Sequence, residues 1–113
     1  MSGISGDILK GHTLTIILSL LEEQPMYGFQ IAKEIRRRSG GTLDFKEGLL
    51  YPALHQLEKD GLAETKWRPA ERGSERKYYF LTRKGRKEAK RLRARWANFT
   101  EAVNQVIEGE SHG

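Results

Sequence analysis

The sequence predicts a mainly α-helical fold with one small β-hairpin and a long helix at its C-terminal end. Apolar residues recur at helical spacing in four segments, and the spacing becomes that of β-strands between residues 62 and 81. A seven-residue apolar repeat then runs through the segment that follows. A chain of 113 residues forms one domain with one modest hydrophobic core.

The composition excludes several classes of function. There is no cysteine, which excludes disulfide scaffolds, thiolate metal sites and cysteine nucleophiles. His12, His55 and His112 share no metal-ligand spacing, and neither a serine nucleophile motif nor a phosphate-binding glycine loop occurs. We therefore expect no enzyme, no metal site and no cofactor. No apolar run has membrane-spanning length and the N-terminus lacks a signal-peptide plan, so we expect a cytoplasmic protein without a membrane partner.

Two helices are predicted first. Residues 8–23 carry apolar side chains at helical spacing, namely Leu14, Ile17, Leu18 and Leu21. Further apolar residues outside that stripe predict burial on more than one side, against the core and against a partner subunit. Pro25 ends this helix, and a second helix is predicted over residues 27–38. A turn containing two glycines then leads into a third helix.

The third helix is predicted to begin near Gly48 and to end at Asp60-Gly61, with Pro52 in its first turn. One face is apolar and consists of Leu50, Ala53, Leu54 and Leu57. The opposite face has no carboxylate and consists of Gly48, Tyr51, Pro52, His55 and Lys59. Such a face is typical of a helix that enters a DNA major groove. The alternative, which fits the pattern equally well, is that Tyr51 and His55 are half-buried against a neighbouring element.

A basic β-hairpin is predicted after this helix. Residues 62–67 and 77–81 are rich in β-formers, and residues 68–76 form a polar loop with proline and glycine. We expect its cations to contact phosphates, namely Arg68, Arg72, Arg76 and Lys77. Residues 66–95 hold 13 of the 20 basic residues against three acidic ones, which is typical of a nucleic-acid-binding face.

The last helix is predicted over residues 83–108, with Thr82 as its N-cap. From Ala89 onward its apolar residues alternate spacings of three and four, which predicts a seam between two helices. The domain is too small to bury this helix alone, so a second copy of the chain is expected to cover the seam. The expected dimer interface consists of Leu92, Trp96, Phe99, Val103 and Val106.

These elements make a winged helix-turn-helix over residues 1–82 and a dimerisation helix with a tail over residues 83–113, packed as one unit. The expected partner is double-stranded DNA, contacted by Lys46, Gly48, Tyr51, Pro52, His55, Lys59, Arg68, Arg72, Arg76 and Lys77. A metal-responsive repressor of similar architecture would need cysteine or clustered histidine ligands. A winged-helix module that binds another protein is the alternative, and the concentrated positive charge argues against it.

Several motifs resemble the PadR family of bacterial transcriptional regulators. They are the Tyr-Gly-Phe-Gln-Ile of residues 27–31, the Gly-Leu-Leu-Tyr-Pro-Ala-Leu-His-Gln-Leu-Glu of 48–58, Gly61-Leu62, Trp67, the Arg-Lys-Tyr-Tyr of 76–79 and Leu81-Thr82-x-x-Gly85. The resemblance covers nearly the whole chain, and the single helix after the wing is similar to the short-tailed branch of that family.

The resemblance implies a homodimeric repressor whose wing and recognition helix bind an inverted repeat. It also implies a small aromatic effector, because family effectors include phenolic acids and, in some short members, flat hydrophobic drugs held at the dimer interface. We expect Trp96, with Leu9 and Ile16, to line such a site and release the operator when it is occupied. Trp96 as a bulky packing residue alone is the alternative.

Overall fold

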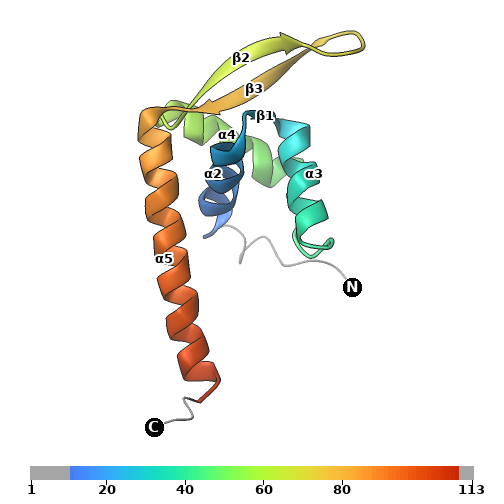
Figure 1. Cartoon of the computed structure of the whole chain (residues 1–113). Helices are drawn as coiled ribbons and strands as arrows, with labels where there is room; N and C mark the ends of the chain where they lie inside the picture. Colours follow the sequence, from blue (N-terminus) through green and yellow to red (C-terminus); the bar gives the residue numbers. More distant parts are fainter. Residues whose placement is uncertain (1–10, 110–113) are drawn as a thin grey trace.

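The structure is a computed structural model, and it describes residues 11–109. The described elements are α2 (Thr13–Glu23), β1 (Met26–Tyr27), α3 (Gly28–Arg38), α4 (Glu47–Lys59), β2 (Ala63–Pro69), β3 (Glu75–Leu81) and α5 (Arg83–Ile107). Figure 1 shows the hairpin of β2 and β3 above the helices, and α5 along one side of the molecule. The predicted fold class, mainly helical with a small hairpin and a long last helix, is confirmed.

The hydrophobic core lies where α2, α3 and α4 meet the sheet. Its fully buried side chains are Ile17, Leu18, Met26, Ile31, Leu50, Leu54 and Leu57. The apolar stripe predicted for α4 is therefore the buried face, with Ala53 partly buried at its edge. In the described residues α2 begins only at Thr13, because Gly11 and His12 form a turn. The start predicted for this helix, residues 8–10, lies outside the described residues.

The sheet has three antiparallel strands in the order β1-β3-β2. The sequence analysis missed β1, whose two residues pair with Tyr78 and Tyr79 of β3. Strands β2 and β3 stay in register from the Ala63–Leu81 pair to the Pro69–Glu75 pair, so both are longer than predicted. The connecting loop shrinks from the predicted 68–76 to residues 70–74, because cross-strand pairing continues through the cations at its base.

Pro52 lies in the second turn of α4 and not in the first, because the helix begins at Glu47. The missing N–H of Pro52 leaves the Gly48 carbonyl without its usual helical donor. Both residues are exposed, so water can satisfy that carbonyl. The predicted glycine stop is confirmed, since Gly61 has a φ of +76° and the Leu62 N–H donates to the Leu57 carbonyl at 2.9 Å.

The start of α5 is fixed tightly against the turn that ends α4. Thr82 is the N-cap, as predicted, and its hydroxyl oxygen accepts a hydrogen bond from the Gly85 N–H at 3.0 Å. The same hydroxyl donates to the Gly61 carbonyl at 2.7 Å. Gly85 is buried, and a Cβ atom at this position would overlap the carbonyl oxygen of Leu62. Only glycine therefore allows α5 to pass this close to the backbone at the start of β2.

The two halves of α5 differ in what covers them. In the first half Ala89 is fully buried and Leu92 packs against the same core, so these two seam residues serve this chain itself. In the second half Trp96, Phe99 and Val106 are 42 %, 56 % and 81 % exposed. Figure 1 shows this part of the helix extending beyond the other elements. Leu92, expected only at the dimer interface, thus has an intrachain role that the repeat did not reveal.

Candidate nucleic-acid interface

The outer face of α4 carries the residues of this helix that were predicted to contact DNA. Gly48, Tyr51, Pro52, His55 and Lys59 are exposed, on the side of the helix opposite its buried leucines. Lys46 is exposed as well, at the N-cap position of the helix, where its Nζ lies 3.2 Å from Asp44 Oδ2. Gly48 and Pro52 carry no long side chain, so another surface can approach the first two turns of α4 closely beside Tyr51.

The orientation of Tyr51 depends on the start of α3. A Cβ atom at Gly28 would lie 2.8 Å from both Cε1 and the hydroxyl oxygen of Tyr51, so the ring lies directly against the Gly28 backbone. Tyr51 is still 45 % exposed. Tyr51 is partly covered by α3, as the packing interpretation expects, whereas His55 is exposed.

Two arginines near the tip of the wing lie on aromatic rings. Arg68 and Arg76 are cross-strand partners, which places them on one face of the sheet. The Arg76 guanidinium lies 4.5 Å from the centre of the Tyr27 ring and donates a hydrogen bond to the Tyr27 hydroxyl at 2.9 Å. Arg68 lies 5.0 Å from the Tyr78 ring centre. These contacts fix the directions of two long side chains that were predicted to lie in a polar loop.

The other two wing cations lie elsewhere. Lys77 is on the opposite face of β3, where its Nζ lies 3.6 Å from Glu58 Oε1 of α4. The Thr65 hydroxyl donates to the same carboxylate at 3.1 Å. Arg72 is exposed in the tip loop, and no hydrogen bond or ion pair joins it to another described residue. The four cations predicted as one phosphate-binding group are thus divided between two faces and a tip.

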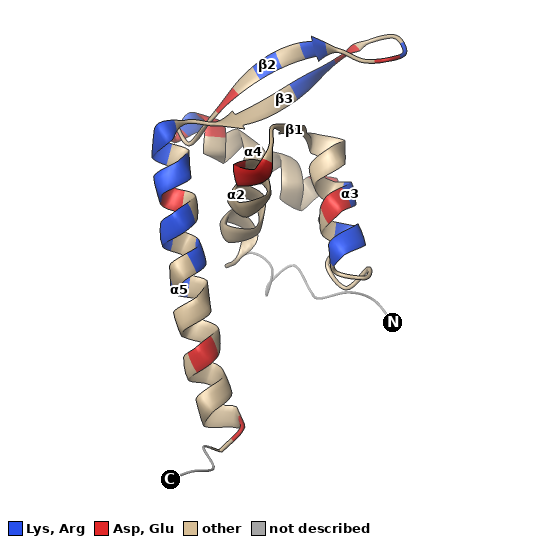
Figure 2. Cartoon of the chain, in the orientation of Figure 1, with Lys and Arg blue, Asp and Glu red and all other residues tan. Residues whose placement is uncertain are grey.

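Positive charge is concentrated in the wing and in the first half of α5. Figure 2 shows Lys and Arg along both regions, and few charged residues in the second half of α5. Part of this charge is neutralised within the chain, because Arg91 pairs with Glu88 at 2.6 Å and Arg93 pairs with Glu22 at 2.8 Å. Arg72 at the wing tip, in contrast, is not neutralised by another described residue.

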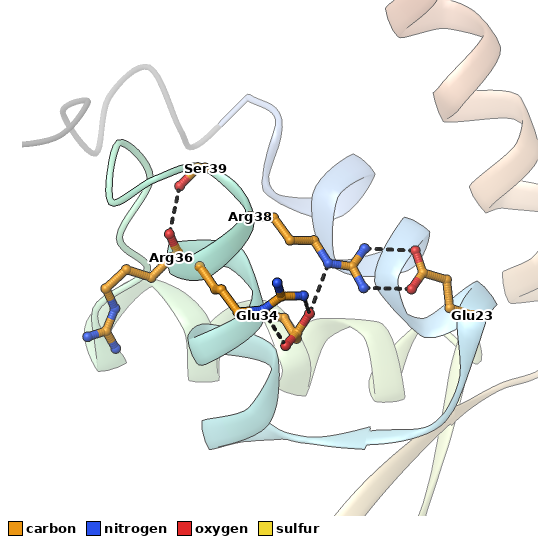
Figure 3. Close-up of polar contacts among 6 residues, drawn as sticks. Glu23, Glu34, Arg36, Arg38 and Ser39 are labelled. Atoms are coloured by element: carbon orange, nitrogen blue, oxygen red, sulfur yellow. Dashed lines mark hydrogen bonds and ion pairs between the residues drawn. The ribbon is translucent and has the colours of Figure 1, made fainter.

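The end of α3 is tied to α2 by an ion-pair network that the sequence did not predict (Figure 3). Arg38 donates to both carboxylate oxygens of Glu23, at 2.7 and 2.8 Å, and to Glu34 at 2.9 Å. Hydrogen bonds from Arg37 and Arg38 lower the pKa of the Glu34 carboxyl from 4.5 to about 2. One of the three arginines that end α3, Arg38, thus joins two helices.

A largely apolar cavity of about 660 Å³ lies between α2, α3 and α5. Its lining includes Ile16 and Trp96, two of the three residues expected at an effector site, while Leu9 lies outside the described residues. His12, which sequence reasoning left without a role, contacts Trp96 edge-on with 4.8 Å between ring centres. The structure thus brings Trp96 and Ile16 together within one protomer.

Among residues 11–109, no helix is long and apolar enough to cross a membrane. No group of three or more histidine, aspartate or glutamate side chains in the same residues is arranged to hold a metal ion.

Comparisons with known sequences and structures point to the same protein family. The profile of the transcriptional regulator PadR-like family matches residues 17–91. A transcriptional regulator from Clostridium thermocellum has a similar structure, with 35 % identity, a TM-score of 0.79, and coverage of 90 % of this chain and 96 % of that one. A PadR-like transcriptional regulator from Bacillus cereus is 27 % identical, with a TM-score of 0.80 over 93 % of this chain and all of that one.

A protein of uncharacterised function from Lysinibacillus sphaericus is 34 % identical over 106 residues, which cover 94 % of this chain and 97 % of that protein. Similarity thus extends along nearly the full length of each relative. The resemblance inferred from the motifs is confirmed, and the chain belongs to the PadR-like family of transcriptional regulators.

Proposed function

We propose that this transcriptional regulator is a homodimeric repressor that binds an inverted repeat in double-stranded DNA. The observation that carries the proposal is the exposed outer face of α4, which combines Tyr51, His55 and Lys59 with two small or rigid residues and no carboxylate. Each protomer offers one such helix, so two-fold symmetry would match two half-sites about one helical turn, roughly 34–36 Å, apart.

The wing supplies the sequence-independent part of binding in this proposal. Arg72 at its tip has no internal partner among the described residues, and Arg76 is held in a fixed direction by Tyr27. Arginine suits phosphate because its planar guanidinium donates two parallel hydrogen bonds. The outer face of α4 then reads base edges in the major groove while the wing holds the register.

Dimerisation is proposed through the second half of α5. Its exposed apolar side chains, Trp96, Phe99 and Val106, continue the seven-residue repeat beyond the point where the chain's own core ends. Ile107 beside them is 72 % exposed. An apolar strip of this kind is rarely left in water, and a second copy of the same helix has the matching pattern.

Regulation is proposed through the cavity beside Trp96. A flat aromatic effector fits a space of about 660 Å³ whose apolar walls include Ile16, Leu20 and Ile35. The cavity adjoins α3, the first helix of the helix-turn-helix, and α5, the proposed dimer helix. A ligand that binds one arrangement of these helices better than the other would change the separation of the two α4 helices and release DNA.

Salt-dependent DNA binding tests the proposal. A duplex selected from a random pool by the full chain is titrated by fluorescence anisotropy at several salt concentrations. Arg72→Ala is expected to weaken binding to this duplex and to an unrelated one alike, and to reduce the salt slope by about one. Lys90→Ala on α5 removes the same charge and serves as the control that retains the slope. If Arg72→Ala has the parental slope, or if the full chain selects no duplex, the proposal is wrong.

A further inference from the structure

The wing carries an exposed tryptophan that does not pack into the hydrophobic core. Trp67, in the middle of β2, is 61 % exposed, whereas Tyr79 two pairs further along the hairpin is 6 % exposed. Large exposed aromatic side chains are costly to leave in water and are frequent at the centres of binding surfaces. Neither the packing of the chain nor the ion pairs of the wing require a ring at this position.

The hairpin register shows which way this ring faces. Trp67 is the cross-strand partner of Lys77, and strand alternation places both on the same face as Thr65 and Tyr79. That face is the one directed towards α4, because Glu58 of α4 lies within 3.6 Å of the Lys77 ammonium and accepts a hydrogen bond from Thr65. Trp67 therefore lies on the inner side of the wing, level with the contact between Lys77 and Glu58.

This inner side adjoins α4, since Thr65 and Lys77 both contact Glu58. Tyr79 lies near their junction, where burial raises the pKa of its hydroxyl and the nearby Glu58 and Tyr51 raise it further. Tyr51 belongs both to this junction and to the exposed face of α4. A duplex whose major groove received that face would bring its sugar–phosphate backbone alongside the inner side of the wing.

We propose that Trp67 is a non-ionic DNA contact, packing its indole ring against deoxyribose groups of the backbone that lies between the wing and α4. This inference rests on the proposed DNA binding and adds to it a contact that no cation supplies. A sugar is the apolar part of the backbone, and a flat ring covers it without neutralising a phosphate. The indole N–H adds one donor, and no hydrogen bond joins it to another described residue.

The surroundings of Trp67 favour DNA over a protein partner. Its cross-strand neighbour Lys77 shares its face and pairs with Glu58, whereas Lys66 and Arg68 point to the opposite face, over the rings of Phe80 and Tyr78. The wing as a whole carries more basic than acidic residues, with Arg72 at the tip beyond Trp67, which suits a polyanion that also has apolar groups, such as a duplex backbone. A protein partner would instead leave DNA affinity unchanged when Trp67 is replaced.

Salt distinguishes this contact from the ionic ones. A side chain that neutralises no phosphate releases no counterion, so its loss weakens binding by the same factor at every salt concentration. Trp67→Ala is therefore expected to weaken binding to the selected duplex about tenfold, at an unchanged salt slope. An unrelated duplex of equal length is expected to lose affinity to a similar extent, because deoxyribose carries no sequence information.

Two controls accompany this variant. Trp67→Phe retains a flat ring and is expected to keep most of the affinity. Phe29→Ala removes an equally exposed aromatic, also 61 % exposed, which lines the groove between α3 and the opposite face of the wing. It is expected to bind the duplex like the parent chain. Circular dichroism of each variant establishes that the fold is intact, as expected for exposed positions.

Fluorescence gives a second readout. In a Trp96→Phe background Trp67 is the remaining tryptophan, and its emission is expected to change when the selected duplex is added. Parental affinity of Trp67→Ala, a reduced salt slope, or unchanged Trp67 emission in a bound complex would overturn this inference alone. Failure of the parent chain to bind any duplex would overturn the proposed function together with it.

Discussion

The two halves of α5 continue one apolar repeat but have different surroundings. In the first half the repeat packs inside the chain, where Gly85 and Ala89 are buried and Leu92 adjoins the core. In the second half the same repeat is exposed at Trp96 and Phe99. The difference teaches that a heptad pattern identifies an apolar face without saying which chain covers it. Substitutions in the first half should therefore lower the stability of the fold, whereas substitutions in the second half should prevent dimer formation.

The largest effect, a loss of folding stability, is expected from a substitution of Gly85 in the first half of α5. Gly85→Ala would force a methyl group onto the Leu62 carbonyl. The methyl group would be attached to the backbone of α5 and would meet the backbone at Leu62, so neither side can move away as a flexible side chain could. We expect the free energy of unfolding to fall by about 3 kcal/mol or more, measured by urea denaturation followed by circular dichroism. Gly48→Ala is the matched control, since a Cβ there meets nothing within 4 Å and alanine favours helix. Equal stability of the two variants would contradict the account of this corner.

The next largest effect, a loss of dimer formation, is expected from a substitution of Val106 in the second half of α5. Val106 is 81 % exposed in the single chain, so Val106→Asp should leave the fold of a protomer intact. It places a carboxylate in the proposed seam, and we expect monomers by sedimentation and loss of binding to the selected duplex. Gln105→Asp adds the same charge about 100° away around the helix and should remain dimeric. An intact dimer of Val106→Asp would remove the second half of α5 from the interface.

A smaller effect concerns Trp96, where the two halves meet. Planar aromatic compounds, phenolic acids among them, are titrated into a Trp67→Phe variant while Trp96 emission is followed. We expect quenching by those compounds that release the selected duplex, because the ring lines the cavity next to Ile16. Trp96→Ala should lose the response to them. If release of DNA persists in Trp96→Ala, Trp96 is a packing residue only.

The smallest effect is expected from the ion pairs that Glu34 forms with Arg37 and Arg38 within α3. The folded-state pKa of Glu34 is lowered from 4.5 to about 2 by Arg37 and Arg38, so its contribution to stability is present above about pH 4.5. That contribution is lost as the pH falls from 4.5 towards 2. Glu34→Gln removes it, so the loss of Tm in this acid range should be shallower than for the parent chain. Parallel Tm curves for the two proteins would contradict this role for Glu34.

Much of the fold could be predicted from sequence because its signals are local. Helical periodicity gave α3 and α4 to within one or two residues, and the N-cap at Thr82 gave the start of α5. Strand β1 could not be predicted, since its two residues form a strand only by pairing with Tyr78 and Tyr79 far along the chain. The lengths of β2 and β3 were underestimated because pairing extends them past the point where β-forming residues end.

The candidate site was predictable in its residue types but not in its geometry. The exposed face of α4 followed from the helical period, and its residues lie where that period places them. The contact of Arg76 with Tyr27, the packing of Tyr51 on Gly28 and the pairing of Lys77 with Glu58 all join separate elements. No local pattern contains such contacts, so sequence reasoning placed four wing cations in one group that the fold divides.

The central claim is that the exposed second half of α5 binds a second copy of the chain. The resulting dimer places two α4 helices so that both can bind the same duplex. Sedimentation velocity of the full chain, alone and with the selected duplex, tests it most directly. The account predicts a dimer at micromolar concentration and a complex of two chains with one duplex. A monomer that binds the duplex one to one, with full affinity, would contradict it.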